Sequence, residues 1–356
     1  MRIFESKALG IPLLPFSAIY LAAWGLRRLL YTFGLRRPAC LNAYVISVGN
    51  LTVGGSGKTP FLLWLGEELL ARGMRVAVVS RGWRRRSRGP RVISDGSQLL
   101  SDVYEAGDEP YLIARRLPGA AVLVDRRRSR AGRMAIEQYG AQVVLLDDAF
   151  QHWSLARDLD VVLIDCQFGL GNGYLLPAGP LREPAREVRR ADEIVLARRG
   201  PVRPSSQRPG EKIVLRSGRR ATLAELRPLA CVRAKGGAED CEWLRGRRVF
   251  AVAAIASPGQ FFATLREMGA EVVGQRAFPD HHWFRPGEVA AIQDQARRAG
   301  AEAVLTTEKD LVRAEPLLGD PAMPWWAVRI ELSPRAEDRP HWETLFRGII
   351  DRLEGE

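Results

Sequence analysis

The first apolar segment of the chain spans residues 8–26 and contains no charged side chain. Pro12 and Pro15 interrupt its beginning, and the apolar residues beyond them recur with the spacing of an α-helix. Arginine and aromatic side chains follow at once, which is typical of a helix end at a bilayer surface. We expect residues 1–37 to form a membrane-associated helix that lies in the interface. The alternatives are a helix that spans the bilayer, for which the length is borderline, and a helix packed on the protein's own core.

From residue 43 onward, short apolar runs rich in β-branched residues alternate with longer segments of helical periodicity. Runs that are apolar throughout are typical of strands buried on both faces of a parallel sheet, with helices covering it. The pattern therefore predicts an α/β fold. The expected strands are residues 44–48, 75–79, 121–124, 142–146, 161–164 and 194–196, followed by a second series at 249–253, 271–273, 303–305 and 326–330.

A stretch rich in Pro, Gly and Ser at residues 200–213 separates the two series of strands. Such composition is typical of a connection between domains. We expect a first α/β domain over residues 38–200, a linker over 201–216, a second, smaller α/β domain over 217–335 and a C-terminal helix within 336–356.

The composition is that of a globular protein, because 46% of the 356 residues are apolar and 26% are charged. These values exclude disorder, collagen and coiled coil as overall descriptions. The four cysteines are scattered without a C-x-x-C pair. This spacing favours a reducing compartment and argues against both a disulfide framework and a zinc site.

The net charge of +12 is concentrated in three basic patches at residues 1–37, 81–91 and 126–133, which together carry +16. The rest of the chain is therefore weakly acidic. Local positive charge predicts an anionic partner, which could be membrane headgroups, nucleic acid or a phosphorylated ligand.

A glycine-rich loop follows the first predicted strand, with the sequence GNLTVGGSGKTP at residues 49–60. Its glycines let the backbone turn tightly and direct N–H groups inward, and the helix that follows adds its positive N-terminal end. A lysine at this position reaches the β- and γ-phosphates of a nucleotide, and the next hydroxyl binds Mg²⁺. Thr52 departs from the general pattern, which has Gly or Ala there. The expected nucleotide-binding residues are Thr52, Gly54, Gly55, Ser56, Gly57, Lys58 and Thr59.

Two carboxylates, Asp147 and Asp148, end the predicted strand 142–146. An acidic residue at the end of a neighbouring strand completes the metal shell of such a loop. We expect Thr59, Asp147 and Asp148 to bind Mg²⁺ beside a nucleoside triphosphate. Because this chemistry needs cytosolic nucleotide, we do not interpret the N-terminal segment as a signal peptide.

Several longer motifs occur along the chain. They are VGNLTVGGSGKTP at 48–60, SRG at 80–82, GDEP at 107–110, DDAFQH at 147–152, RDL at 157–159, GNGYLLPAGPLRE at 171–183, FPDHH at 278–282 and TEKD at 307–310. In this order they resemble the tetraacyldisaccharide 4'-kinase family, which phosphorylates a membrane-embedded glucosamine disaccharide in the lipid A pathway. Thr52 is normal for this family, and the small departures are Ala149, Trp83 and Ala254.

The resemblance implies a P-loop kinase-like parallel-sheet domain, a second, smaller α/β domain and an N-terminal membrane-associated helix. It implies transfer of the ATP γ-phosphate to the 4'-hydroxyl of a tetraacyl disaccharide 1-phosphate at the cytoplasmic face of the bacterial inner membrane. The partners expected are this lipid and the membrane surface, with neither nucleic acid nor an obligate protein partner.

The resemblance also implies a catalytic pair. A sugar hydroxyl attacks only as its proton leaves, and a positioned carboxylate or histidine can accept that proton. The family's base corresponds to Asp108, acting with His281. One comes from each domain, so that domain approach would assemble the pair and limit ATP hydrolysis. Glu109, Gln151 and His152 are expected as supporting residues near the metal or the γ-phosphate.

Two other functions are alternatives to this one. A regulatory P-loop GTPase should carry the guanine-reading pattern Asn/Thr-Lys-x-Asp, whereas residues 307–310 read TEKD and have the wrong spacing. Nucleic-acid binding through the arginine patches lacks a supporting motif. The patch at residues 81–91 is either a basic lid over a phosphorylated substrate or a solvated loop.

Overall fold

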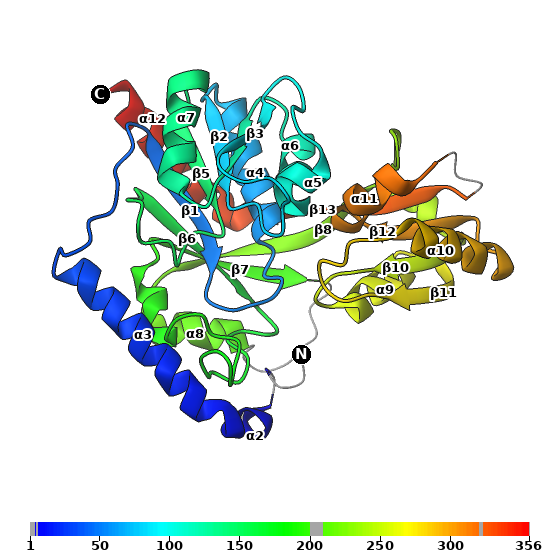
Figure 1. The fold of residues 1–356 in the computed structure, drawn as a ribbon, viewed down its shortest axis with the longest axis horizontal. Helices are drawn as coiled ribbons and strands as arrows, with labels where there is room; N and C mark the ends of the chain where they lie inside the picture. The colour runs from blue at the N-terminus through cyan, green and yellow to red at the C-terminus, as the bar shows by residue number, and fades with distance from the viewer. Residues whose placement is uncertain (1–3, 5, 200–208, 320–322, 356) are drawn as a thin grey trace.

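The computed structural model describes residues 4, 6–199, 209–319 and 323–355. One sheet of 13 strands runs through both halves of the molecule (Figure 1). Its strand order is β11-β10-β12-β13-β8-β7-β6-β1-β5-β2-β4-β3, and β9 pairs with β8. The α/β fold class expected from the alternating pattern is confirmed.

The first half of the sheet is parallel, apart from the antiparallel edge strand β3. Its interior strands are buried along nearly their whole length, which explains why their sequences are apolar at successive positions. The strands are β1 (Tyr44–Asn50), β2 (Val76–Ser80), β3 (Arg91–Asp95), β4 (Ala121–Val124), β5 (Val143–Asp147), β6 (Leu159–Asp165) and β7 (Glu193–Arg199).

Helix α4 (Lys58–Ala71) lies against one face of this half and is apolar on nearly every side. Such a helix must be covered all round, and its outer face is covered by the C-terminal helix α12 (Arg339–Glu354). Trp64 of α4 meets Trp342 of α12 edge to face, with ring centroids 5.3 Å apart. The other helices of this half are α5 (Val103–Ala106), α6 (Asp108–Arg116), α7 (Arg128–Tyr139) and α8 (Pro209–Ser217).

Two long strands connect the halves. β8 (Ala221–Arg233) begins parallel to β7 in the first half and continues antiparallel to β13 (Trp325–Pro334) into the second. The second half then continues as a parallel sheet with its own core. Its further elements are β9 (Ala238–Glu239), β10 (Arg248–Ala253), α9 (Pro258–Glu267), β11 (Glu271–Ala277), α10 (Pro286–Arg298), β12 (Ala303–Thr307) and α11 (Glu308–Ala314).

The N-terminal segment forms α2 (Lys7–Gly10), one turn of 3-10 helix and the long helix α3 (Leu14–Thr32), which runs along one flank of the first half (Figure 1). The residues 7–32 are apolar and long enough to cross a membrane. The structure therefore contains the apolar N-terminal helix expected, as a candidate membrane-associated segment.

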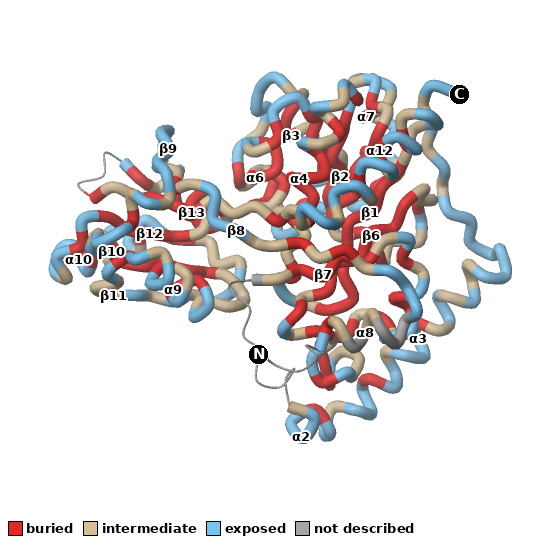
Figure 2. Tube along the Cα trace, turned by 180° about the vertical axis from the view of Figure 1, so that it is seen from behind, coloured by how far each residue is buried: buried red, intermediate tan, exposed pale blue. Residues whose placement is uncertain are grey.

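Helix α3 turns the face with Ser17, Tyr20 and Trp24 toward the protein. Ser17 Oγ donates to Leu175 O at 2.9 Å, the Tyr20 hydroxyl donates to Arg182 O at 2.7 Å, and Trp24 is buried. The large apolar side chains point the other way, and most of this helix is coloured exposed or intermediate in Figure 2. The exposed ones include Phe16, Ile19, Leu26 and Leu29.

Some elements differ from the expectation. The antiparallel edge strand β3 and the long connecting strand β8 were missed. Of the expected linker, residues 201–208 lie outside the described residues, and residues 209–216 form most of helix α8. The limits proposed for the domains stay a prediction.

The packing of α12 makes a stability prediction. Replacing Phe346, which is 1% exposed, with Ala should lower the free energy of unfolding by about 3–5 kcal/mol, because it removes a ring from the core shared with α4. Phe33→Ala is the matched control: that ring is 72% exposed, and its loss should cost less than about 0.5 kcal/mol. Urea denaturation measures both, and equal losses would contradict the packing described.

Candidate active site

The glycine-rich loop leaves the end of β1 and enters the first turn of α4 at Lys58. Gly54 and Gly57 have φ angles of +112° and +85°, which residues with a side chain rarely adopt. A Cβ on Gly57 would also lie 2.7 Å from the Leu332 side chain. The Ser56 hydroxyl is buried and has no hydrogen-bond partner in the described part of the chain. An unpaired donor beside a helix N-terminus fits the phosphates of a nucleotide.

Asp147 and Asp148 follow one another at the end of β5, but their surroundings shift the two pKa values in opposite directions. Ser80 Oγ donates to Asp147 Oδ2 at 2.9 Å, while burial, with the charges of Glu109 and Asp148, raises the pKa of Asp147 to about 6. Asp148 has a φ of +47° and accepts from Arg182 Nη1 at 2.8 Å on both oxygens. Burial alone would raise its pKa, but Lys58, at 3.7 Å, and Arg182 bring it down to about 2.

The oxygen atoms at this point fit a hard divalent cation. Thr59 lies in the first turn of α4, and Asp147 and Asp148 lie on the neighbouring strand end. Within the described ranges, no group of three His, Cys, Asp or Glu side chains forms a closed metal site. Mg²⁺ typically uses one or two carboxylates, with phosphates and water supplying its other ligands, so these residues suit it.

Asp108 and His281 meet across the two halves of the molecule. Asp108 begins α6 in the first half, and His281 follows β11 in the second half. His281 Nδ1 lies 2.7 Å from Asp108 Oδ2. This hydrogen bond raises the pKa of His281. Burial opposes ionisation of Asp108, but the bond from His281 and the charge of Arg313 outweigh it and lower its pKa to about 2.

The backbone around His281 is unusual for a residue with a side chain. Its φ is +57°, in the left-handed region that non-glycine residues seldom occupy. The strained position is maintained from both halves, because Arg84 Nη1 donates to the His281 carbonyl at 3.1 Å and the His281 N–H donates to Ala254 O at 3.1 Å. Strain of this kind often accompanies a functional site.

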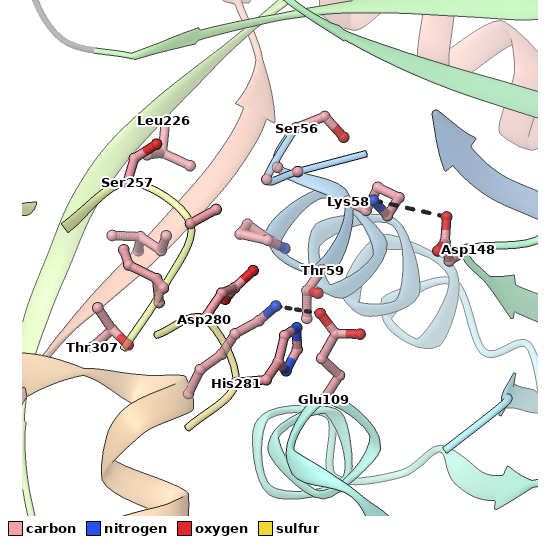
Figure 3. Close-up of a pocket in the computed structure, with 18 of the residues that line it drawn as sticks. Ser56, Lys58, Thr59, Glu109, Asp148, Leu226, Ser257, Asp280, His281 and Thr307 are labelled. Carbon is pink, nitrogen blue, oxygen red and sulfur yellow. Dashed lines mark hydrogen bonds and ion pairs between the residues drawn. The ribbon is translucent and has the colours of Figure 1, made fainter. Parts of the chain in front are cut away.

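A cavity of about 1590 Å³ connects the glycine-rich loop with the second half. Lys58, Thr59, Glu109, Asp148 and His281 border the same space in the close-up (Figure 3). Asp108, by contrast, is 3% exposed and lies behind His281, outside the cavity lining. The cavity also reaches helix α3, where Tyr20 and Arg27 line it.

The part of the cavity that reaches α3 is basic. Gln151 and His152 line it beside Arg27, Arg81 and Arg128. Burial, followed by the charges of Arg128 and Arg27, lowers the pKa of His152 to about 4, so its ring is neutral at physiological pH. A region with this excess of positive charge suits an anionic group of a ligand.

The structure brings most of the expected site residues together. Thr52 is the exception within the loop, because it is buried in a bridge with Leu181 and does not line the cavity. The role of Arg182 beside Asp148 is not evident from the sequence, although the arginine stands inside the motif at residues 171–183. Lys309 forms an ion pair with Glu109, and because the two residues are 200 positions apart, the sequence does not show that they are partners.

Comparisons with known proteins agree with this geometry. A family model described as "Tetraacyldisaccharide-1-P 4'-kinase" matches residues 9–350. The chain is 47% identical over 313 residues to the tetraacyldisaccharide 4'-kinase of Anaeromyxobacter dehalogenans strain 2CP-C, covering 87% of this chain and 82% of that protein. It is 41% identical over 333 residues to the enzyme of the same name from Pelobacter propionicus, covering 93% and 90%.

A solved structure extends the likeness to three dimensions. The crystal structure of LpxK from Aquifex aeolicus in complex with ATP matches with a TM-score of 0.75 and 32% identity, over 97% of this chain and 99% of that one. These matches in sequence and in fold show that the chain belongs to the tetraacyldisaccharide 4'-kinase family.

Proposed function

We propose that the protein transfers the γ-phosphate of ATP to the 4'-hydroxyl of a tetraacyl glucosamine disaccharide 1-phosphate, giving the bis-phosphorylated lipid A precursor. The reaction would take place at the cytoplasmic face of the bacterial inner membrane, with Mg²⁺ as the metal. The observation that carries the proposal is that one cavity joins the glycine-rich loop, His281 and helix α3.

The nucleotide end of the cavity offers a cradle for a triphosphate. The backbone of Gly54, Gly55 and Gly57 and the hydroxyl of Ser56 would surround the phosphates, and Lys58 would turn from Asp148 toward them. Thr59, Asp147 and Asp148 would hold Mg²⁺, which would neutralise the negative charge that develops on the phosphates during transfer. Arg182 then keeps Asp148 ionised and oriented.

The Asp108–His281 pair is suited to accept the proton of the attacking hydroxyl. The Asp108 carboxylate fixes His281 with Nδ1 as the donor, which leaves Nε2 as the ring nitrogen able to take a proton. The resemblance assigns the base to Asp108, yet His281 is the member of the pair that lines the cavity. We therefore propose that the proton passes to the pair through His281 and that Asp108 stabilises the resulting imidazolium.

The lipid end of the cavity suits an acceptor that stays in the membrane. The outward apolar side chains of α3 would lie among the acyl chains and headgroups. Tyr20 and Arg27 on the same helix line the cavity, so the disaccharide would reach the nucleotide without leaving the surface. The basic group Arg27, Arg81 and Arg128 would receive the 1-phosphate.

The reaction itself is directly testable. Purified protein incubated with ATP, Mg²⁺ and the tetraacyl disaccharide 1-phosphate in detergent should form the 4'-phosphorylated lipid, and EDTA should abolish transfer until Mg²⁺ is restored. A folded preparation that binds ATP and forms no such product would refute the proposal.

The two adjacent histidines offer a matched test of the proton acceptor. His281→Gln should lower kcat by about 10²–10⁴ and leave ATP affinity nearly unchanged, because it removes the base and no phosphate contact. His282 instead bonds Glu288 through Nε2 at 2.9 Å, so His282→Gln should keep kcat near the wild-type value. Asp108→Asn should resemble His281→Gln. Equal effects of the two histidine variants on kcat would remove His281 from the chemistry.

The membrane role of α3 is tested by charge on its outer face. The double variant Ile19→Asp, Leu26→Asp should weaken binding to anionic vesicles roughly tenfold or more, because buried aspartate is strongly disfavoured in a bilayer. ATP binding should persist, since neither side chain contacts the nucleotide loop. Leu229→Asp, on an exposed residue of β8, is the control. Undiminished flotation of the double variant would show that another surface binds the membrane.

A further inference from the structure

Arg313 is a buried cation that the proposed reaction has not yet used. It lies in α11 and its side chain is 1% exposed. Its Nη2 donates to Ala254 O and its Nε donates to Lys309 O, each at 3.2 Å. It also pairs with the buried Asp310. Its remaining nitrogen, Nη1, lies 3.5 Å from Asp108 Oδ2.

The other contacts of Arg313 lead to the loop that carries His281. Asp310 Oδ2 accepts from the Ala254 N–H at 3.1 Å and from the Thr307 hydroxyl at 2.8 Å. The Ala254 carbonyl accepts from Arg313 and also from the His281 N–H at 3.1 Å. The guanidinium and the His281 backbone therefore share one anchoring carbonyl.

The charges explain why a cation is needed here. Asp108 and Asp310 are both carboxylates and both buried, at 3% and 0% exposure. A buried charge is costly unless it is paired. Asp310 pairs with Nη2 of Arg313, which leaves Nη1 facing the second carboxylate, Asp108. Nη1 has no hydrogen-bond partner among the described residues and faces the carboxylate of Asp108. Asp108 Oδ2 therefore has two neighbours, the ring of His281 and the buried guanidinium of Arg313.

We propose that Arg313 is a positioning residue for the Asp108–His281 pair. Its guanidinium comes from the second half of the molecule, keeps the Asp108 carboxylate ionised and orients it toward His281. Its hydrogen bond to Ala254 O fixes the position of the loop that carries His281. The inference rests on the proposed role of the pair as proton acceptor. It assigns the segment Thr307–Asp310, together with Arg313, a part in building the site as well as in joining the halves.

Other ion pairs between the halves provide a control for the joining role. Arg115 lies in α6, the helix that begins with Asp108, and pairs with Glu315, which directly follows α11, the helix of Arg313. It does not line the cavity, and no contact joins it to Asp108 or His281 within the described residues. Loss of this pair weakens the contact of the halves and leaves the catalytic pair in place.

A double-mutant cycle tests whether Arg313 acts through Asp108. Arg313→Met should lower kcat roughly a hundredfold with the ATP dissociation constant unchanged, because misplacing a reacting group by about 1 Å can cost that much. In an Asp108→Asn background the same change should have almost no further effect, since the group it positions is already lost. Arg313→Lys should recover part of kcat, and Arg115→Gln should stay near wild type.

The outcomes separate this inference from the proposed function. A loss of kcat on Arg313→Met that is equally large in the Asp108→Asn background, or an unchanged kcat, overturns the positioning role. Failure of the wild-type protein to phosphorylate the lipid overturns the proposed function instead, and full activity of Asp108→Asn removes the role of the pair as proton acceptor. If Arg313→Met does not bind ATP, the cycle is repeated with Arg313→Lys. The smaller decrease in kcat that this variant causes must likewise disappear in the Asp108→Asn background.

Discussion

The hydrogen bond between Asp108 and His281 joins residues 173 positions apart and one from each half of the molecule. Neither half contains the pair by itself, so the site depends on how the halves meet. β8 and β13 carry the sheet across the junction, and α6 and α11 are joined by the ion pairs of Arg116 with Glu308 and of Glu109 with Lys309. Arg84 reaches from the first half to the His281 carbonyl and completes the contact. The phosphate loop, in contrast, is complete within the first half.

The second constraint is the orientation of α3. It contacts the protein through Ser17, Tyr20 and Trp24, and most of its large apolar side chains face outward. Tyr20 bonds the carbonyl of Arg182, whose side chain pairs with Asp148. A short chain of contacts therefore runs from the helix proposed to meet the membrane to the carboxylate proposed to hold Mg²⁺. This arrangement would bring a membrane-bound acceptor and a soluble nucleotide together in one cavity.

Local features of the sequence predicted local parts of the structure. The phosphate loop, Asp147 and Asp148 stand directly after apolar strands, so their places follow from the strand pattern. β8 was missed because Pro228 and several polar residues interrupt its apolar pattern, and the strand forms through its pairing with β7 and β13. The face of α3 that contacts the protein was likewise not evident, since apolar periodicity does not say whether protein or lipid covers it. The role of Arg313 could not be predicted, because Ala254 and Asp108, its two contacts at the site, are distant in the chain.

The pairing of Asp108 with His281 can be measured directly by following the imidazole resonances of the four histidines as pH changes. The resonances can be assigned by replacing each histidine in turn, and His152, with its pKa of about 4, should be clearly separate. The account predicts that His281 titrates above its ordinary value of 6.5 in the wild-type protein and that its pKa falls in Asp108→Asn. A His281 that titrates at or below 6.5, unchanged by Asp108→Asn, would contradict the pairing on which the site is built.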